Sequence, residues 1–387
     1  MKIIFTGGGT AGHIFPGLAV IEELHMLAQE NHEPIEVMWI GSKKENEQKL
    51  VESYGVPFYR IPTGKLRRYF SLQNVLDFFK VIGGIIKSFR LLGKLKPDLI
   101  FSKGGFVAVP PCIAAKILRI PIITHESDFS PGLTTKIISK FATKIFVSYT
   151  DTISQFPPDI RTRCVYTGNP VRKIFYTASA EYGKAFLSFP YTEPKNANKK
   201  ILLVIGGSLG AKQINDLVLA NIVLLCENFF VVHQLGAANF SQHTEIEAAL
   251  AKKAPQLLAS YKPFDFIGNE MPHLLAAADL VVSRAGANSL WEIISQHKPS
   301  LLIPLSAGSS RGDQLENAEF FAKAHCAEVL DGEQVTPENF LHTLLLISND
   351  ETKRQIMIDA TKKILPEPAA QKIAESIVML LKGENNE

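Results

Sequence analysis

The chain has 387 residues, of which 46% are hydrophobic, and a formal net charge of +3. This length exceeds what one typical core supports, so two domains are expected, and the nearly balanced charge argues against a nucleic-acid-binding protein. No apolar run reaches about 18 residues, so no membrane span is expected. A strand is expected from the third residue, which leaves no room for a signal peptide, and the four isolated cysteines predict reduced thiols in a cytosolic protein.

Short apolar runs alternate with helical patterns along the chain. The first expected strand, Lys2–Thr6, runs into a glycine turn and then into a helix that begins near Pro16. Later strands are expected at residues 36–40, 99–102, 122–125, 144–147, 201–205, 229–234, 280–283 and 300–303, with helices at 72–95, 212–226 and 369–382. Strands that alternate with helices predict parallel sheets covered by helices on both faces.

A degenerate repeat divides the chain. The opening IIFTGGGTAGHIFPGLAV resembles ILLVIGGSLGAKQINDLV at residues 201–218, and both copies show a strand, a glycine turn and a helix. Two such copies predict two doubly wound domains, each with a potential anion site at the carboxyl ends of its strands. We place the domains at residues 1–168 and 169–368, and the amphipathic last helix, within 369–387, could pack on either. The polar stretch 188–200 is typical of a surface linker into the second domain's first strand.

The first turn fits the G-x-G-x-x-G spacing of a dinucleotide site through Gly7, Gly9 and Gly12. Such a site also needs an acidic residue at the end of the second strand to hold the ribose, but that strand ends in WIGSKKE. His13 follows the third glycine, where a dehydrogenase turn generally has a small or apolar residue. A nicotinamide enzyme is therefore disfavoured, and we expect the His13 ring to face an anion site.

Five further stretches place glycines or polar side chains at the ends of expected strands. They are FSKGGFVAVPP (101–111), THESDFSPGL (124–133), TGNPVR (167–172), SRAGANSLWEI (283–293) and SRGDQLENA (310–318). With the two glycine turns they closely resemble the MurG family, peripheral-membrane glycosyltransferases that add N-acetylglucosamine to the lipid-linked N-acetylmuramoyl-pentapeptide of bacterial peptidoglycan synthesis. The resemblance covers nearly the whole chain. It implies an α/β fold of the glycosyltransferase B type, two Rossmann-like doubly wound parallel-sheet domains facing across a cleft.

The resemblance implies that the second domain holds UDP-N-acetylglucosamine. Glu292 matches a glutamate that accepts hydrogen bonds from the ribose hydroxyls, a task that suits an ionised carboxylate. Ser208 matches the loop that contacts the diphosphate, and Ile267 matches a position whose backbone reads the uracil edge. The other residues assigned to the donor are Thr10, Ala11, Gly12, His13, Asp128, Arg172, Arg284, Ala287, Asn288 and Gln314.

The acceptor side is implied in the first domain, where the first glycine turn would face the lipid pyrophosphate. The residues assigned to the acceptor are Gly8, Gly9, Thr10, Gly104 and Gly105. The reaction implied is an inverting displacement by the muramoyl 4-hydroxyl at the anomeric carbon. His13 suits a general base because imidazole titrates near neutrality. Asp128 is the alternative candidate for the base, and Glu126 is the third residue assigned to catalysis.

Two departures from the family pattern and one absent motif qualify these assignments. Asp128 stands where some members carry asparagine, and Asp313 stands before Gln314 where some carry glutamine. Each exchange replaces an amide donor by an acceptor-only carboxylate, so these contacts do not carry over. No D-x-D motif is present, so neither a metal nor a cofactor is expected. Helix-N-terminal N–H groups would instead stabilise the departing diphosphate.

The segment 64–98 combines eight lysines and arginines with many large apolar residues. One interpretation is a core helix with a solvated basic edge. The other is a patch that inserts into an anionic membrane surface, which suits a polyprenyl-linked acceptor and predicts a peripheral location on the cytoplasmic face of the bacterial plasma membrane. The residues of this membrane patch are Phe78, Phe79, Ile82, Ile85, Ile86, Lys87 and Arg90.

Three alternative functions remain open from the sequence. Another enzyme of the same fold could glycosylate a different lipid, and a UDP-sugar epimerase would need no acceptor. A non-catalytic nucleotide-binding module would have little use for two anion turns.

Overall fold

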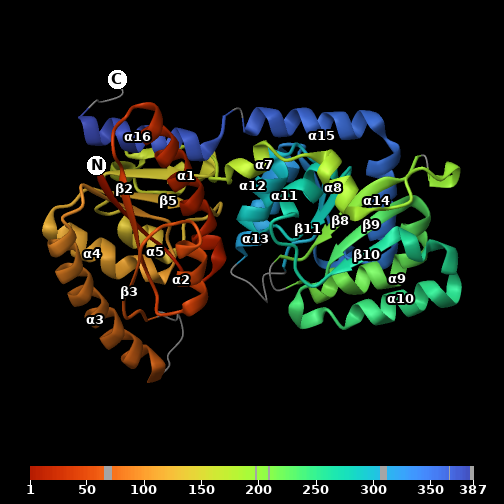
Figure 1. Cartoon of the computed structure of the whole chain (residues 1–387), viewed down its shortest axis with the longest axis horizontal. Helices are drawn as coiled ribbons and strands as arrows, with labels where there is room; N and C mark the ends of the chain where they lie inside the picture. The colour runs from red at the N-terminus through yellow and green to blue at the C-terminus, as the bar shows by residue number, and fades with distance from the viewer. Residues whose placement is uncertain (65–71, 197, 208–209, 306–311, 366, 384–387) are drawn as a thin grey trace. The chain divides into compact units, whose positions relative to one another are not determined.

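The computed structural model describes residues 1–64, 72–196, 198–207, 210–305, 312–365 and 367–383. The chain forms two compact units (Figure 1). The N-terminal unit comprises Met1–Lys173 and the chain from Glu367 onwards, and the C-terminal unit comprises Ile174–Pro366. Among the described residues, no helix has both the length and the hydropathy needed to cross a membrane.

The N-terminal unit is built on a seven-stranded parallel sheet of order β3-β2-β1-β4-β5-β6-β7. The order reverses between β1 and β4, so the loops that follow these two strands border the switch point, where open α/β sheets bind ligands. The strands are β1 (Lys2–Thr6), β2 (Glu36–Gly41), β3 (Phe58–Arg60), β4 (Leu99–Ser102), β5 (Ile122–Glu126), β6 (Lys144–Val147) and β7 (Cys164–Tyr166).

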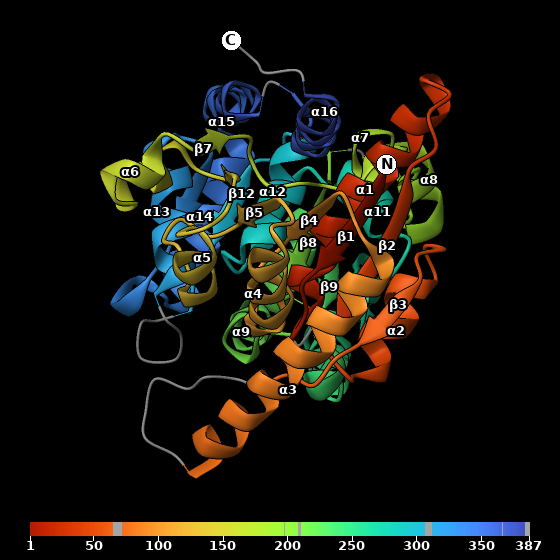
Figure 2. The same ribbon diagram turned by 90° about the vertical axis from the view of Figure 1, so that its left-hand side faces the viewer.

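Helices cover both faces of this sheet, as its buried strands require. In β1, Ile3 and Phe5 face a core formed with α1 and α16, and Ile4 faces a second core formed with α3, α4 and α5 (Figure 1, Figure 2). The helices are α1 (Phe15–Glu30), α2 (Glu45–Glu52), α3 (Leu72–Leu95), α4 (Val109–Leu118), α5 (Leu133–Ile138), α6 (Pro158–Arg161) and α16 (Ala369–Lys382), with 3₁₀ turns at Ala11–His13, Phe106–Ala108 and Thr150–Gln155.

The last helix, α16, settles a question that the sequence left open, because it packs on the N-terminal unit. Ile373 and Ile377 are fully buried in the core shared with α1. Lys144 Nζ donates to Ser376 Oγ at 2.9 Å, and Lys382 forms an ion pair with Glu33 at 3.0 Å.

The C-terminal unit contains a six-stranded parallel sheet of order β10-β9-β8-β11-β12-β13, with its switch point between β8 and β11. The strands are β8 (Lys200–Ile205), β9 (Phe229–Gln234), β10 (Tyr261–Phe264), β11 (Leu280–Ser283), β12 (Ser300–Leu302) and β13 (Ala327–Val329). The helices are α7 (Lys173–Tyr176, at the boundary), α8 (Ala180–Leu187), α9 (Lys212–Asn228), α10 (Gln242–Lys253), α11 (Met271–Ala277), α12 (Ala287–Ser295), α13 (Asp313–Lys323), α14 (Pro337–Asn349) and α15 (Glu351–Ile364), with 3₁₀ turns at Pro194–Asn196, Ala237–Asn239, Pro255–Ser260 and Gly332–Gln334.

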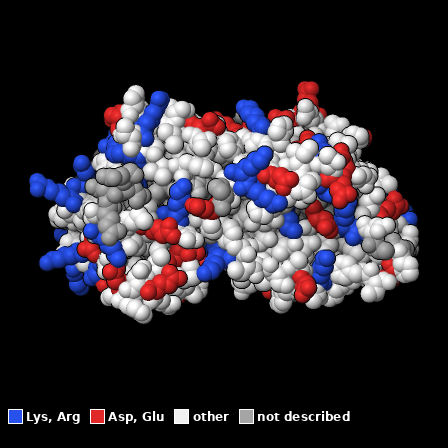
Figure 3. Space-filling view, turned by 90° about the horizontal axis from the view of Figure 1, so that it is seen from above, with Lys and Arg blue, Asp and Glu red and all other residues white. Residues whose placement is uncertain are grey.

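The predicted fold class, two doubly wound parallel sheets, is confirmed. The stretch 188–200, expected as a surface linker into the second domain's first strand, leads into β8 and leaves several of its described residues exposed, and it belongs to the C-terminal unit. Phe189 is buried there and stacks on Phe230 with ring centroids 4.7 Å apart. The face shown in Figure 3 mixes acidic and basic side chains, in keeping with the small net charge.

Candidate functional site

The two glycine loops of the N-terminal unit lie against each other at its switch point. A Cβ atom on Gly105 would lie 2.4 Å from the Gly8 carbonyl oxygen and 2.9 Å from His13 Cδ2. A Cβ atom on Gly7 would lie 2.7 Å from the His13 carbonyl oxygen. Glycine is therefore required at both positions, and Gly105 also has a φ of +73°. The structure thus brings together Gly8 and Gly105, which were assigned to the acceptor, and His13, which was assigned to catalysis and to the donor.

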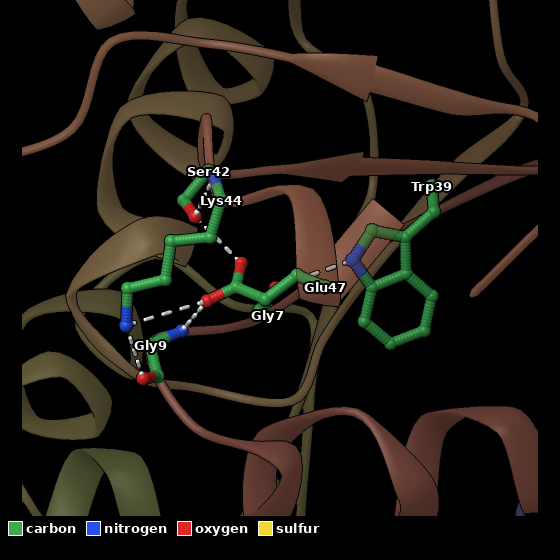
Figure 4. A network of polar contacts seen from close by, with 6 residues as sticks. All are labelled: Gly7, Gly9, Trp39, Ser42, Lys44 and Glu47. Atoms are coloured by element: carbon green, nitrogen blue, oxygen red, sulfur yellow. Dashed lines mark hydrogen bonds and ion pairs between the residues drawn. The ribbon is translucent and has the colours of Figure 1, made fainter. Parts of the chain in front are cut away.

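A carboxylate that the sequence did not single out holds the first glycine loop (Figure 4). Glu47, at the start of α2, is buried, and its Oε1 accepts a hydrogen bond from the Gly9 N–H at 2.8 Å. Its Oε2 accepts from Ser42 Oγ at 2.7 Å. From β2, Trp39 Nε1 donates to the Gly7 carbonyl at 3.2 Å. The N–H of Gly9, one of the predicted acceptor-binding groups, is therefore already bonded to a carboxylate of the chain.

A lysine completes this clamp on the loop. Lys44 Nζ donates to the Gly9 carbonyl at 2.9 Å and lies 3.9 Å from Glu47 Oε1 (Figure 4). Both backbone polar groups of Gly9 are thus engaged by side chains that follow β2. In a dinucleotide site an acidic residue at the end of this strand would hold the ribose. In this chain the carboxylate of Glu47, on the helix α2 that follows the strand, fixes the glycine loop.

On the other side of β4, the loop after β5 is organised by Glu126. Its Oε1 accepts from the N–H groups of Ser127 at 2.9 Å and Asp128 at 3.1 Å, and its Oε2 accepts from the Gly132 N–H at 3.0 Å. The Glu126 carboxylate is buried and has three backbone donors. Its position suits a residue that shapes the loop carrying Asp128.

A buried lysine links this loop to the second glycine pair. Lys103 directly precedes Gly104 and is only 1% exposed. Its Nζ donates to Ser127 Oγ, which in turn donates to Asn169 Oδ1 at 2.7 Å. Burial lowers the pKa of Lys103 to about 8, against the opposing charges of Glu126 and Asp128. The sequence analysis missed Lys103, because a lysine beside two glycines is more often a solvated loop residue.

His125 and Arg172 also lie in the N-terminal unit. His125 Nε2 lies 3.0 Å from the Gly168 carbonyl, and burial, with the nearby charge of Lys103, lowers the pKa of this imidazole well below its usual value. Arg172, which was assigned to the donor, donates to Tyr54 Oη at 3.1 Å and stacks over the Phe15 ring at 4.7 Å.

In the C-terminal unit, Gly210 of the second glycine turn packs against the chain just after β9. A Cβ atom on Gly210 would lie 1.9 Å from the Leu235 carbonyl oxygen, and this glycine has a φ of +76°. Ser208 lies outside the described residues. Gln234, the last residue of β9, donates to the Gly207 carbonyl at 3.0 Å and accepts from the Ile267 N–H at 3.0 Å. Gln234 thereby ties the turn to the predicted uracil-reading position.

The junction after β11 is fixed by Arg284. Its Nη1 donates to Gln213 Oε1 at 2.9 Å and to the carbonyls of Ile303 at 3.1 Å and Pro304 at 3.3 Å. Burial lowers the pKa of this guanidinium. Arg284 therefore joins α9 to the ends of β11 and β12, and these contacts place it in the framework of the site.

Three helix N-termini meet the carboxyl ends of neighbouring strands in this unit. α9, α12 and α13 follow β8, β11 and β12, and these strands pair side by side. Ala287 is the first residue of α12, and Asn288 and Glu292, which are half-buried, lie on the same helix. Gln314, in the first turn of α13, accepts from the Leu305 N–H at 3.0 Å. Free N–H groups at such ends favour a diphosphate.

The titratable side chains form no obvious metal centre in the part of the chain that the structure describes. No group of three or more His, Cys, Asp or Glu residues there is arranged to hold an ion. The described residues place glycine turns and helix N-termini at the carboxyl ends of the strands in both units, with His13 and Asp128 in one unit and Glu292 on α12 in the other. That combination suits the transfer of a group away from a nucleoside diphosphate.

Comparisons with known proteins agree with this interpretation. A relative from Treponema denticola, named UDP-N-acetylglucosamine–N-acetylmuramyl-(pentapeptide) pyrophosphoryl-undecaprenol N-acetylglucosamine transferase, is 47% identical over 100% of this chain and 99% of its own. A Bacillus cereus protein with the same name and the suffix 2 is 40% identical over 97% of this chain and 99% of its own. The crystal structure of Acinetobacter baumannii MurG, 25% identical, covers 97% of this chain and 99% of its own with a TM-score of 0.69. The models of the glycosyltransferase family 28 N-terminal and C-terminal domains match residues 3–147 and 201–376, so the chain belongs to glycosyltransferase family 28.

Proposed function

We infer that this chain is an N-acetylglucosamine transferase of peptidoglycan synthesis. It moves the sugar from UDP-N-acetylglucosamine to N-acetylmuramoyl-(pentapeptide) pyrophosphoryl-undecaprenol. The observation that carries this inference is the 47% identity, over the whole chain, to a relative named for that reaction. The resemblance to MurG is thereby confirmed, and the lipid glycosyltransferase and epimerase alternatives are not favoured.

The donor is proposed to bind at the switch point of the C-terminal unit. The N-termini of α9, α12 and α13 support a diphosphate site there, because each offers backbone N–H groups and the positive end of a helix dipole. Glu292 on α12 supplies the carboxylate for the ribose diol, and Ile267, held by Gln234, is proposed to meet the uracil. Negative charge that develops on the departing UDP would be stabilised by the same N–H groups.

The acceptor is proposed to bind at the switch point of the N-terminal unit. Its 4-hydroxyl oxygen forms the new bond to the anomeric carbon, the bond from that carbon to the UDP oxygen breaks, and the hydroxyl proton passes to a base. His13 and Asp128 are the candidates: His13 lies on the loop after β1, which borders this switch point, and Asp128 lies on the loop after β5, the strand next to β4. We assign Glu126 to positioning, because its oxygens already accept three backbone hydrogen bonds.

The choice of base is open to a direct test. His13→Ala should lower turnover about 100- to 10,000-fold if His13 takes the proton. If that variant loses less than about tenfold while Asp128→Ala is nearly inactive, the base is Asp128.

A membrane-facing role is proposed for α3. Among the side chains described from residue 77 onwards, the helix buries Asp77, Ser88 and Leu92 together with Gly84, and it packs on α4. The residues that remain exposed include Phe78 at 55%, Phe79 at 64% and Ile86 at 50%, together with Ile82, Lys87 and Arg90, while Ile85 is half-buried. Large exposed apolar side chains beside basic ones suit an anionic bilayer surface and disfavour the core-helix interpretation.

The proposed reaction is tested by transfer of labelled N-acetylglucosamine from its UDP donor to a lipid-linked muramoyl acceptor. Labelled lipid and free UDP should appear in equal amounts, and neither should appear when the acceptor is omitted. Conversion of UDP-N-acetylglucosamine alone into a new UDP-sugar, without labelled lipid, would identify an epimerase and overturn the proposal.

A further inference from the structure

We propose that Lys103 is a positioning residue for the transfer reaction: its buried ammonium fixes the loop after β5 and supplies positive charge beside Asp128 on that loop. The inference rests on the proposed function and adds a residue that acts on the acceptor side through its neighbours. Lys103 lies at the carboxyl end of β4, at the switch point, directly before the glycine pair at 104–105.

The first argument is the hydrogen-bond chain that begins at Lys103. The side chain is fully enclosed, and its Nζ donates to Ser127 Oγ. Ser127 then donates to the buried Asn169 Oδ1 at 2.7 Å. One ammonium thereby connects the ends of β4 and β5 with the loop after β7. A displacement of Lys103 would reach the loop that carries Asp128 directly.

The second argument is charge. Buried lysines are rare because the ammonium loses its hydration, and the bonded neighbours here, Ser127 and Asn169, are neutral. The carboxylates of Glu126 and Asp128 favour the charged form, but burial outweighs them and lowers the pKa of Lys103 to about 8. An apolar side chain of the same length would fill this space without that cost, and a neutral amide could donate to Ser127. Retention of a charge in this enclosed place points to a task that requires it.

The third argument concerns what the charge acts on. The titratable groups around Lys103 are His125 and Glu126 on β5 and Asp128 on the following loop. His13 lies near the next residue along, since a Cβ atom on Gly104 would lie 4.0 Å from its Nδ1. A nearby cation disfavours the protonated form of a histidine and favours the ionised form of an aspartate. The ammonium of Lys103 thus places positive charge beside Asp128 and, through Ser127, holds the loop that carries it.

The test compares Lys103→Met with the wild-type enzyme over pH 5.5 to 9.5, with both substrates varied. In the wild type, kcat/KM for the acceptor should fall above about pH 8 as Lys103 loses its proton. In Lys103→Met that alkaline decline should vanish, and kcat at pH 7 should fall by about tenfold or more. The KM for UDP-N-acetylglucosamine should stay within about twofold of the wild-type value.

Two further variants separate charge from bonding and from general effects. Lys103→Gln keeps a hydrogen-bond donor for Ser127 but removes the charge, so its pH profile should match that of Lys103→Met. If Lys103→Met does not fold, the profile of Lys103→Gln alone tests whether the charge is needed. Lys298→Met is the control for general effects of removing a buried amine. Burial lowers the pKa of Lys298 too, and its Nζ donates to the Ala276 carbonyl at 2.7 Å in the C-terminal unit. This variant should keep the wild-type pH profile.

The outcomes are distinct. Wild-type activity in Lys103→Gln, or a Lys103→Met profile that is merely scaled down without a change of shape, overturns the inference while the proposed function stands. Absence of transfer by the wild type overturns the proposed function and the inference with it. A changed profile with an unchanged donor KM supports both.

Discussion

Replacing Lys103 by methionine should stabilise the N-terminal unit at neutral pH even though it lowers activity. Burial lowers the pKa of Lys103 from 10.5 to about 8, and each pKa unit corresponds to about 1.4 kcal/mol. The charged form therefore costs the fold about 3 kcal/mol. Loss of the hydrogen bond to Ser127 removes about 1 kcal/mol of stabilisation. The net change in the free energy of unfolding should be an increase of about 2 kcal/mol.

The size of this increase depends on pH in a definite direction. Between the folded pKa of about 8 and the unfolded value of 10.5, the unfolded chain holds more protons than the folded chain. Wild-type stability therefore rises with pH across this window as the buried charge is lost. The advantage of Lys103→Met should be complete below pH 8 and should shrink as the pH rises through this window. Above about pH 10.5 it should give way to a deficit of about 1 kcal/mol, because only the lost hydrogen bond to Ser127 then remains.

The chain offers a separate optical probe for each unit. It contains two tryptophans, Trp39 in β2 and Trp291 in α12. With Trp291→Phe in every sample, the fluorescence of Trp39 during urea unfolding reports on the N-terminal unit alone. Lys298→Met, in the other unit, serves as the control and should leave the Trp39 transition in place. A lower free energy of unfolding for Lys103→Met at pH 7, or an equal gain at pH 10, would refute the reasoning.

Three further predictions concern binding. Glu47→Ala removes the buried carboxylate that accepts a hydrogen bond from the Gly9 N–H. The KM for the lipid substrate should therefore rise roughly 10- to 100-fold, with the KM for the UDP-sugar unchanged. A lower KM for the lipid substrate would mean that the carboxylate competes with it for the Gly9 N–H. Glu292→Ala should lose about 1.5–3 kcal/mol of donor binding, seen as at least a tenfold rise in the KM for UDP-N-acetylglucosamine, and an unchanged KM contradicts the assignment. Changing Phe78 and Phe79 together to serine should weaken sedimentation with anionic vesicles at every salt concentration. The control Ile356→Ser changes an equally exposed apolar residue on α15 and should not weaken it. If the double variant binds vesicles as well as the control does, α3 is excluded as the membrane patch.

The central strands could be predicted from the sequence because both of their faces are buried. β1, β4 and β8 are near-continuous apolar runs, as expected for strands covered by helices on two sides. The strands that were missed, β3, β7, β10 and β13, are the edge strands of the two sheets. They have three or four residues and include half-exposed positions. Short segments with one open side lack the apolar run that identifies a buried strand.

The candidate site was predictable where backbone conformation alone required particular residues. Gly105 and Gly210 occupy left-handed backbone positions against neighbouring carbonyls, and their spacing after apolar runs marked both loops. Glu47 and Lys103 could not be found in this way. Their contacts are with Gly9 and Ser127, 38 and 24 residues away along the chain. Only the order of the strands brings these pairs together.

The return of α16 to the N-terminal unit has a consequence for how the protein is made. The face of α1 that α16 covers stays open on the ribosome until the final residues emerge. The whole of Ile174–Pro366 is synthesised in between, which at roughly 5–20 residues per second takes on the order of 10–40 s. During that interval the nascent first unit displays an apolar stripe with no native partner, while the second unit is free to fold on its own. A stop codon just before Ala369 should therefore leave the first unit bound to chaperones, because its apolar stripe stays exposed, while the second unit still folds.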